Sequence, residues 1–216
     1  MQNEEMYKNY EKMAKGTTTL GIICSDGVVM AADTRATEGP YIISSETRKV
    51  WKIDSNLAMT VAGLVGDAQG LIRILKAQNE IYKMNEGKPL SPKSAASMLS
   101  MLMQENRMYP FYVELLIGGI DDTESQLFHI DGVGGSTQET KFVASGSGEF
   151  FILSYLEDHY NKSLTTKEGL KMAANALKIA MKRDSASGDN VILVSITKSG
   201  YIEYTGKDVE KFLTVK

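Results

Sequence analysis

The stretch Gly16-Thr17-Thr18-Thr19-Leu20-Gly21-Ile22-Ile23 places a Gly–Thr bond at the start of an apolar run, after a short polar leader. If the Gly16–Thr17 bond is cut, Thr17 carries a free α-amine beside its own hydroxyl. A hydroxyl is a poor nucleophile at its ordinary pKa, and an N-terminal amine titrates close enough to neutrality to take its proton. The stretch therefore predicts an N-terminal threonine hydrolase, although threonine runs are also common in ordinary strands.

The residues that follow support the catalytic interpretation. Asp26-Gly27 is a hairpin signal between the apolar runs 20–23 and 28–32. The second run ends at Asp33, and a further extended segment reaches Lys49. An acidic and a basic side chain are therefore expected near the first strand.

The rest of the chain alternates between strand and helix patterns. A buried strand is predicted over 57–62, and Gly63 ends it. Helical spacing of apolar residues predicts helices over 64–84, from an N-cap at Ser91 to about 108, over 150–160 and over 166–181. Further strands are predicted over 113–117, 126–130, 140–144, 191–196 and 201–204. This order favours an α+β fold in which two stacked antiparallel sheets are covered by helices on both outer faces.

Composition sets broad limits on function. A chain of 216 residues, 43% of them hydrophobic, can bury one sizeable core, so a single domain is expected. The formal net charge of −3 gives no reason to expect nucleic acid or an anionic membrane as a partner. The leader lacks the apolar core of a secretory signal, and no stretch approaches the roughly 18 apolar residues of a membrane span. We therefore expect a cytoplasmic protein.

Cofactor chemistry is not predicted. Cys24, the single cysteine, cannot form an intrachain disulfide and is expected to be a small buried residue. His129 and His159 are far apart in sequence, so no metal-ligand spacing exists, and we expect neither a metal nor another cofactor. The chain also lacks a G-x-x-x-x-G-K-[ST] motif, so it does not look like an ATPase itself.

Several motifs together resemble the catalytic β subunits of the 20S proteasome, above all the archaeal form. The resemblance covers Thr17 to about the C-terminus, and its motifs follow the order and near spacing of the family. They are Thr17-Thr18-Thr19-Leu20-Gly21-Ile22, the segment 26–37, Lys49, Ala62-Gly63-Leu64-Val65-Gly66-Asp67-Ala68, Gly146-Ser147-Gly148 and Arg183-Asp184-Ser185-Ala186-Ser187-Gly188. The resemblance implies a four-layer αββα sandwich, a propeptide over residues 1–16 that is removed on maturation, and one catalytic domain over 17–216.

The resemblance also implies a role for each site residue. Thr17 is the nucleophile, Lys49 favours its developing alkoxide, and Asp33 holds that lysine as an ion pair. Gly63 lies where a strand turns into a helix, so its N–H is expected to stabilise the oxyanion. Ser147, Asp184 and Ser187 position the Thr17 amine and a catalytic water, and Arg35 gives structural support near the site.

Specificity and assembly are implied in the same way. Four residues are expected to line the primary pocket, and none of them is charged: Ala36, Thr47, Val61 and Val65. Cleavage after large apolar residues is therefore predicted. The family's architecture implies two homo-heptameric β rings between rings of α subunits, with unfolded polypeptides as substrates and an ATPase cap acting through the α rings. Autocatalytic cleavage at Gly16–Thr17 would use Lys49 and Gly63 a first time.

Three alternatives stay open at this point. One is a non-catalytic structural ring subunit, against which the presence of Thr17, Asp33 and Lys49 argues. Another is a bacterial-type two-ring threonine peptidase, against which the motifs at 63–68 and 183–188 argue. The third is a small-amide hydrolase that uses the same kind of N-terminal nucleophile.

Overall fold

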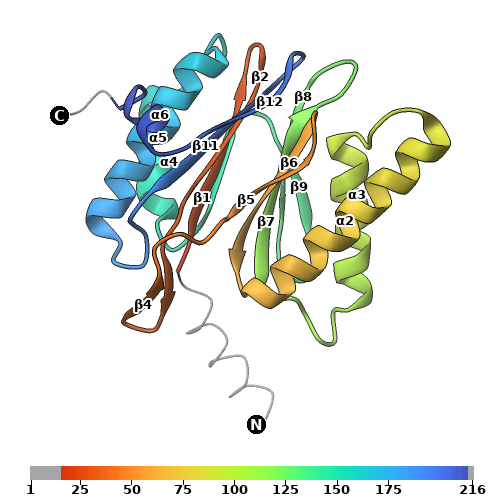
Figure 1. The fold of residues 1–216 in the computed structure, drawn as a ribbon, viewed down its shortest axis with the longest axis horizontal. Helices are drawn as coiled ribbons and strands as arrows, with labels where there is room; N and C mark the ends of the chain where they lie inside the picture. Colours follow the sequence, from red (N-terminus) through yellow and green to blue (C-terminus); the bar gives the residue numbers. More distant parts are fainter. Residues whose placement is uncertain (1–15, 214–216) are drawn as a thin grey trace.

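The computed structural model describes residues 16–213, and these form a four-layer sandwich (Figure 1). Two five-stranded antiparallel sheets pack face to face, with the strand orders β10-β1-β2-β11-β12 and β5-β6-β7-β8-β9. Helices α4 and α5 cover the first sheet, and helices α2 and α3 cover the second. The predicted αββα architecture is confirmed.

The first sheet contains the stretch 16–23, most of which forms β1. Cys24 pairs with Gly27 across the predicted Asp26-Gly27 turn, and every residue of β2 is buried because a sheet and a helix layer cover its two faces. The strands of this sheet are β1 (Thr18–Cys24), β2 (Gly27–Asp33), β10 (Phe142–Gly146), β11 (Val191–Thr197) and β12 (Gly200–Tyr204).

The second sheet contains the predicted strand that ends at Gly63. Its strands are β5 (Val50–Asp54), β6 (Leu57–Gly63), β7 (Val113–Ile120), β8 (Ser125–Ile130) and β9 (Ser136–Glu139). A separate two-stranded hairpin, β3 (Ala36–Glu38) with β4 (Tyr41–Ser44), projects from the body of the sandwich (Figure 1). Strands β3 and β9 have no counterpart among the predicted elements.

The helices agree closely with the periodicity of the sequence. They are α2 (Val65–Glu86), α3 (Pro92–Glu105), α4 (Glu149–His159), α5 (Thr166–Arg183) and the short, unpredicted α6 (Lys207–Glu210). Ser91 caps α3 as predicted, because its hydroxyl accepts the Ser94 N–H at 3.1 Å. The predicted end of α3 at about residue 108 is wrong. The N–H groups of Asn106 and Arg107 bond carbonyls three residues back, so the chain leaves the helix through tighter turns.

Three hydrophobic layers hold the sandwich together. Val28, Met30 and Leu116 are among the fully buried residues between the two sheets. A second layer lies between the first sheet and α4 with α5, and a third between the other sheet and α2 with α3. The sheets are therefore fixed on both faces, which makes the strand ends rigid supports for side chains.

Candidate active site

Thr17 lies directly before β1, and its hydroxyl bonds the carbonyl of the preceding residue. Thr17 Oγ donates to the Gly16 oxygen at 2.7 Å, and Lys49 Nζ donates to the same oxygen at 3.3 Å. Thr17 is 7% exposed and Lys49 is 4% exposed. The predicted nucleophile, the predicted lysine and the carbonyl of the predicted cleavage site therefore meet at one buried point.

Lys49 forms a buried ion pair with Asp33, the last residue of β2. Its Nζ lies 2.8 Å from Asp33 Oδ1 and 2.5 Å from the Arg35 carbonyl oxygen. The Asp33 carboxylate also accepts the N–H groups of Thr18, Arg35 and Gly188, at 2.9, 3.1 and 3.0 Å. Burial lowers the pKa of the Lys49 ammonium, and the negative charge of Asp33 opposes that shift. Four donors hold Asp33 in one orientation, so the lysine has a fixed partner.

Ser147, Asp184 and Ser187 form a second cluster on the other side of Thr17, which we call the Asp184 cluster. Both serine hydroxyls donate to Asp184 Oδ2 at 2.5 Å. The Ser147 N–H donates to the Thr17 carbonyl at 2.9 Å, which ties the cluster to the candidate nucleophile. Asp184 is the C-cap of α5, and Ser147 comes just before the N-cap of α4. Two helix ends therefore deliver these polar groups to the same place.

Gly63 ends β6 one residue before the N-cap of α2, as its predicted place at a strand-to-helix turn requires. Its φ is +124°, and a Cβ there would lie 2.1 Å from the Tyr112 carbonyl oxygen. Any side chain is excluded on both counts. Gly63 also lines the cavity that Thr17 lines.

That cavity has a volume of about 280 Å³, and four of the predicted catalytic residues are not among those that line it: Asp33, Ser147, Asp184 and Ser187. Thr17, Lys49 and Gly63 line it along with all four predicted pocket residues: Ala36, Thr47, Val61 and Val65. Its walls also include side chains that the sequence did not indicate, among them Thr37, Glu38, Ile43, Arg48, Trp51 and Leu64. The charges of Glu38 and Arg48 are exposed, and Arg48 pairs with Glu203.

Arg35 lies beside the site and does not line the cavity. Its guanidinium pairs with Asp189 at 3.0 Å and donates to the Ser185 carbonyl at 3.0 Å. A Cβ on Gly188 would lie 2.2 Å from the Arg35 Cζ, so the guanidinium packs directly on that glycine. These contacts brace the loop that carries Ser187, which agrees with a supporting role.

Thr18 joins the site although the sequence indicated no role for its side chain. Its N–H donates to Asp33, and its hydroxyl contacts Ser187 Oγ at 2.5 Å. Strand alternation points its side chain to the opposite face from Thr19. A role for the Thr18 hydroxyl could not be predicted from the sequence, because threonine is also a common packing residue in buried strands.

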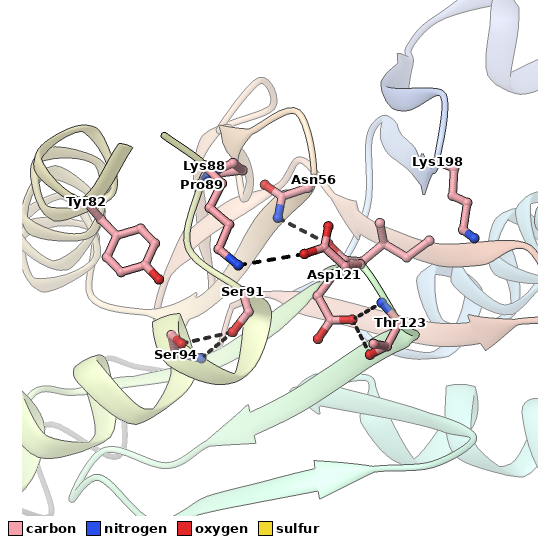
Figure 2. Close-up of a pocket in the computed structure, with 11 residues that line it drawn as sticks. Asn56, Tyr82, Lys88, Pro89, Ser91, Ser94, Asp121, Thr123 and Lys198 are labelled. Atoms are coloured by element: carbon pink, nitrogen blue, oxygen red, sulfur yellow. Dashed lines mark hydrogen bonds and ion pairs between the residues drawn. The ribbon is translucent and has the colours of Figure 1, made fainter. Parts of the chain in front are cut away.

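A second, larger cavity lies at the other end of β6 from Gly63 and contains none of the predicted site residues. It has a volume of about 510 Å³, and its lining includes Asn56, Lys88, Asp121 and Thr123 (Figure 2). Asn56 Oδ1 has no hydrogen-bond partner there, whereas the Asp121 carboxylate is occupied by Thr123 and neighbouring groups. Asp121 closes the turn at Thr123 and Glu124, and Ser91 caps α3, so these two polar groups have local structural partners.

Other candidate chemistry is absent from the described residues. Cys24 is buried as predicted, and burial raises the pKa of its thiol to about 12, so it is not a reactive thiolate. Among residues 16–213, no group of three His, Cys, Asp or Glu side chains is placed to hold a metal ion. Over the same range, no helix is long and apolar enough to cross a membrane.

Two antiparallel sheets between helix pairs, with a threonine at the start of the first strand beside a buried lysine, define the fold class of the N-terminal nucleophile hydrolases. The family described as "Proteasome subunit" matches residues 13–196. The chain belongs to the proteasome subunit family.

Relatives in archaea carry the name "Proteasome subunit beta". The chain is 43% identical to the one from Methanosarcina barkeri over 200 residues, which is 93% of this chain and 95% of the relative. It is 42% identical to that of Methanococcus aeolicus over 99% of this chain and 97% of the relative. For Methanocaldococcus fervens the identity is 44%, over 92% of this chain and 89% of the relative.

Proposed function

We propose that this chain is the catalytic β subunit of a 20S proteasome, a threonine endopeptidase that degrades unfolded polypeptides. The observation that carries the proposal is the convergence of Thr17 Oγ and Lys49 Nζ on the Gly16 carbonyl, above a fully buried Asp33. A buried lysine is costly unless it is paired, and a structural subunit has no need for one beside a threonine hydroxyl.

In peptide hydrolysis, the free amine of Thr17 takes the proton of its own hydroxyl, and Oγ attacks the substrate carbonyl carbon. Lys49 stabilises the negative charge that develops on Oγ, and the Gly63 N–H stabilises the charge on the carbonyl oxygen. The peptide C–N bond breaks, its nitrogen takes the proton, and an ester on Thr17 remains. Water held near the Asp184 cluster then hydrolyses the ester and restores the hydroxyl.

The same groups are proposed to release the amine in the first place. Before cleavage the Thr17 nitrogen is an amide and cannot act as a base, and the Lys49 ammonium, which donates to the Gly16 carbonyl at 3.3 Å, stabilises the negative charge that develops on that carbonyl oxygen. Thr17 Oγ attacks the Gly16 carbonyl carbon, the Gly16–Thr17 C–N bond breaks, the hydroxyl proton ends on the Thr17 nitrogen, and an ester replaces the amide. Water hydrolyses this ester to give a carboxylate on Gly16 and a free amine on Thr17. The proposed propeptide, residues 1–16, lies outside the described residues except for Gly16, and 17–216 is the proposed catalytic domain.

Gly16→Ala is expected to slow self-processing by about tenfold or more. A Cβ at this position would lie 2.2 Å from Thr37 Oγ, so the two residues must move apart, and we expect the shift to take the Gly16 carbonyl away from Thr17 and Lys49. The rate of appearance of the shortened chain, followed by intact mass, measures the effect. Thr37→Ala removes the clashing oxygen, so the double variant Gly16→Ala/Thr37→Ala should recover much of the rate. Equal rates for Gly16→Ala and wild type would contradict the proposed geometry.

Ala36→Phe is expected to shift the preferred P1 residue from large to small apolar side chains. The cavity beside Thr17 is lined by Ala36, Thr47, Val61 and Val65, and an aromatic ring at position 36 would fill part of it. Fluorogenic peptides that differ only at P1 measure the change, with Leu and Tyr expected to fall at least about tenfold relative to Ala. Peptides with Glu or Arg at P1 should be poor substrates of both forms, because a charge would be desolvated there. An unchanged P1 profile would place the specificity pocket elsewhere.

The assembly is proposed to be two homo-heptameric β rings stacked between rings of proteasome α subunits. Unfolded polypeptide enters through the α rings, which also carry the regulatory ATPase cap. The names of the relatives support a β subunit, and the family supports a particle of many subunits. Particles that form only when an α subunit is present would distinguish this from a bacterial-type two-ring peptidase.

Substrate class separates the proposed peptidase from the remaining alternatives. The reconstituted particle is offered a denatured protein, fluorogenic peptides and simple acyl amides. Hydrolysis of the first two is expected. Turnover confined to simple amides would indicate a small-amide hydrolase, and none at all in a processed particle would indicate a structural subunit.

A further inference from the structure

Thr18 hydrogen-bonds to both the Lys49–Asp33 pair and the Asp184 cluster. Its N–H donates to Asp33 Oδ1 at 2.9 Å, and Asp33 holds Lys49. Its hydroxyl lies 2.5 Å from Ser187 Oγ, and Ser187 donates to Asp184. Both Thr18 and Ser187 are completely buried. Thr18 therefore stands between the Lys49–Asp33 pair and the Asp184 cluster, and Thr17 is joined directly to it.

The hydrogen-bond directions in this chain follow from the donors available. The Asp184 carboxylate only accepts, so the single Ser187 proton is committed to it. Thr18 must then be the donor in its contact with Ser187. Thr18 Oγ in turn accepts the N–H of Gly148, at 2.9 Å. The polarity therefore runs one way, from Gly148 through Thr18 and Ser187 to Asp184.

The backbone around Thr18 is shaped to admit its hydroxyl. A Cβ on Gly148 would lie 2.4 Å from Thr18 Oγ, so glycine is what lets the N-cap of α4 come so close. Valine has the shape of threonine without the hydroxyl. It would leave the buried Gly148 N–H without its acceptor and Ser187 without its donor.

We propose that Thr18 is a positioning residue for Thr17, a role that rests on the proposed function. By donating to Ser187, the Thr18 hydroxyl fixes the rotation of the Ser187 hydroxyl. Ser187 shares Asp184 Oδ2 with Ser147, and the Ser147 N–H holds the Thr17 carbonyl at 2.9 Å, so the orientation of this cluster bears on the position of Thr17. Loss of the Thr18 hydroxyl leaves its N–H bond to Asp33 and the Asp33–Lys49 pair in place but loosens the cluster that holds Thr17, so it should act on the reaction step more than on substrate binding.

Thr18→Val and Thr18→Ser separate this role from packing. Both variants are assembled with an α subunit, and kcat and KM are measured on a fluorogenic peptide. Thr18→Val is expected to lower kcat about tenfold or more with KM within about twofold, while Thr18→Ser retains most of the activity. Thr19→Val is the matched control. Thr19 is the next buried threonine of β1, and its hydroxyl bonds Ser145 and Thr60 away from the Asp184 cluster.

The opposite ranking, an active Thr18→Val and a weak Thr18→Ser, would overturn the proposal and leave Thr18 a packing residue. Equal losses in the two variants would overturn it as well. If Thr18→Val does not assemble, Thr18→Ala and Thr18→Ser decide the matter, because those two side chains differ only in the hydroxyl. Inactive wild-type particles with a processed Thr17 would overturn the proposed function itself, and the role of Thr18 with it.

Discussion

Thr17→Ala is expected to abolish peptide hydrolysis by the assembled particle, with a loss of at least about 10³-fold to the background rate. The Thr17 hydroxyl bonds the Gly16 carbonyl oxygen, to which Lys49 Nζ also donates. Alanine is expected to leave the fold intact because the buried Thr17 side chain is small and lies directly before β1. Hydrolysis of a fluorogenic peptide with an apolar P1 residue measures the loss.

Thr17→Ser is the matched variant because it keeps the hydroxyl and removes the β-methyl. The methyl restricts χ1 and aims the oxygen, so serine should retain activity at a reduced rate. Equal activity of Thr17→Ala and wild type would contradict the assignment of Thr17 as nucleophile. A serine variant that had assembled and been processed, yet was as inactive as the alanine variant, would contradict it too.

Lys49→Met is expected to lower kcat/KM by about 10² to 10³-fold and to slow self-processing as well. Methionine is similar in length but carries no charge, so the alkoxide on Thr17 loses its nearest positive partner. The variant also leaves Asp33 buried without its ion-pair partner, at a cost of about 3 kcal/mol in unfolding free energy. Three backbone N–H groups still donate to Asp33, so we expect the chain to fold and assemble.

Lys52→Met controls for the loss of a positive charge. Lys52 lies three residues further on in β5, is exposed, and contacts the Tyr201 ring and not the cavity. Its replacement should leave kcat/KM within about twofold.

Burial lowers the pKa of Lys49, and its ammonium is lost as the pH rises through that pKa. The alkaline fall in wild-type activity should therefore begin below the pH expected for an exposed lysine. Normal self-processing and normal kcat/KM in Lys49→Met would contradict a catalytic role for Lys49.

Much of this arrangement could be predicted because periodic patterns are strong along this chain. The Asp26-Gly27 turn, the strands around it and the long apolar stripes of α2 and α5 appear close to their predicted bounds. Thr17, Asp33 and Lys49 meet because the start of β1, the end of β2 and the start of β5 lie at the same end of the sandwich. The short connections between these strands, all within the first 54 residues, were enough to predict that an acidic and a basic side chain lie near Thr17.

The features that were missed lack such a pattern. Strand β9 (Ser136–Glu139) is a short polar edge strand with no apolar alternation, and α6 is only one turn long. Trp51 and Leu64 line the cavity because the β3–β4 hairpin and the start of α2 enclose it, and this depends on tertiary packing. The hydrogen bond from Thr18 to Ser187 joins residues 169 positions apart, a contact that no local pattern reveals.

Intact mass of the chain after assembly with a proteasome α subunit tests the central claim most directly. Wild type, Thr17→Ala and Lys49→Met are assembled and weighed side by side. The account predicts a chain that starts at Thr17 in the wild type, an unprocessed chain in Thr17→Ala, and delayed processing in Lys49→Met. An unprocessed wild-type chain in fully assembled rings, or a Thr17→Ala chain shortened at the normal rate, would contradict it.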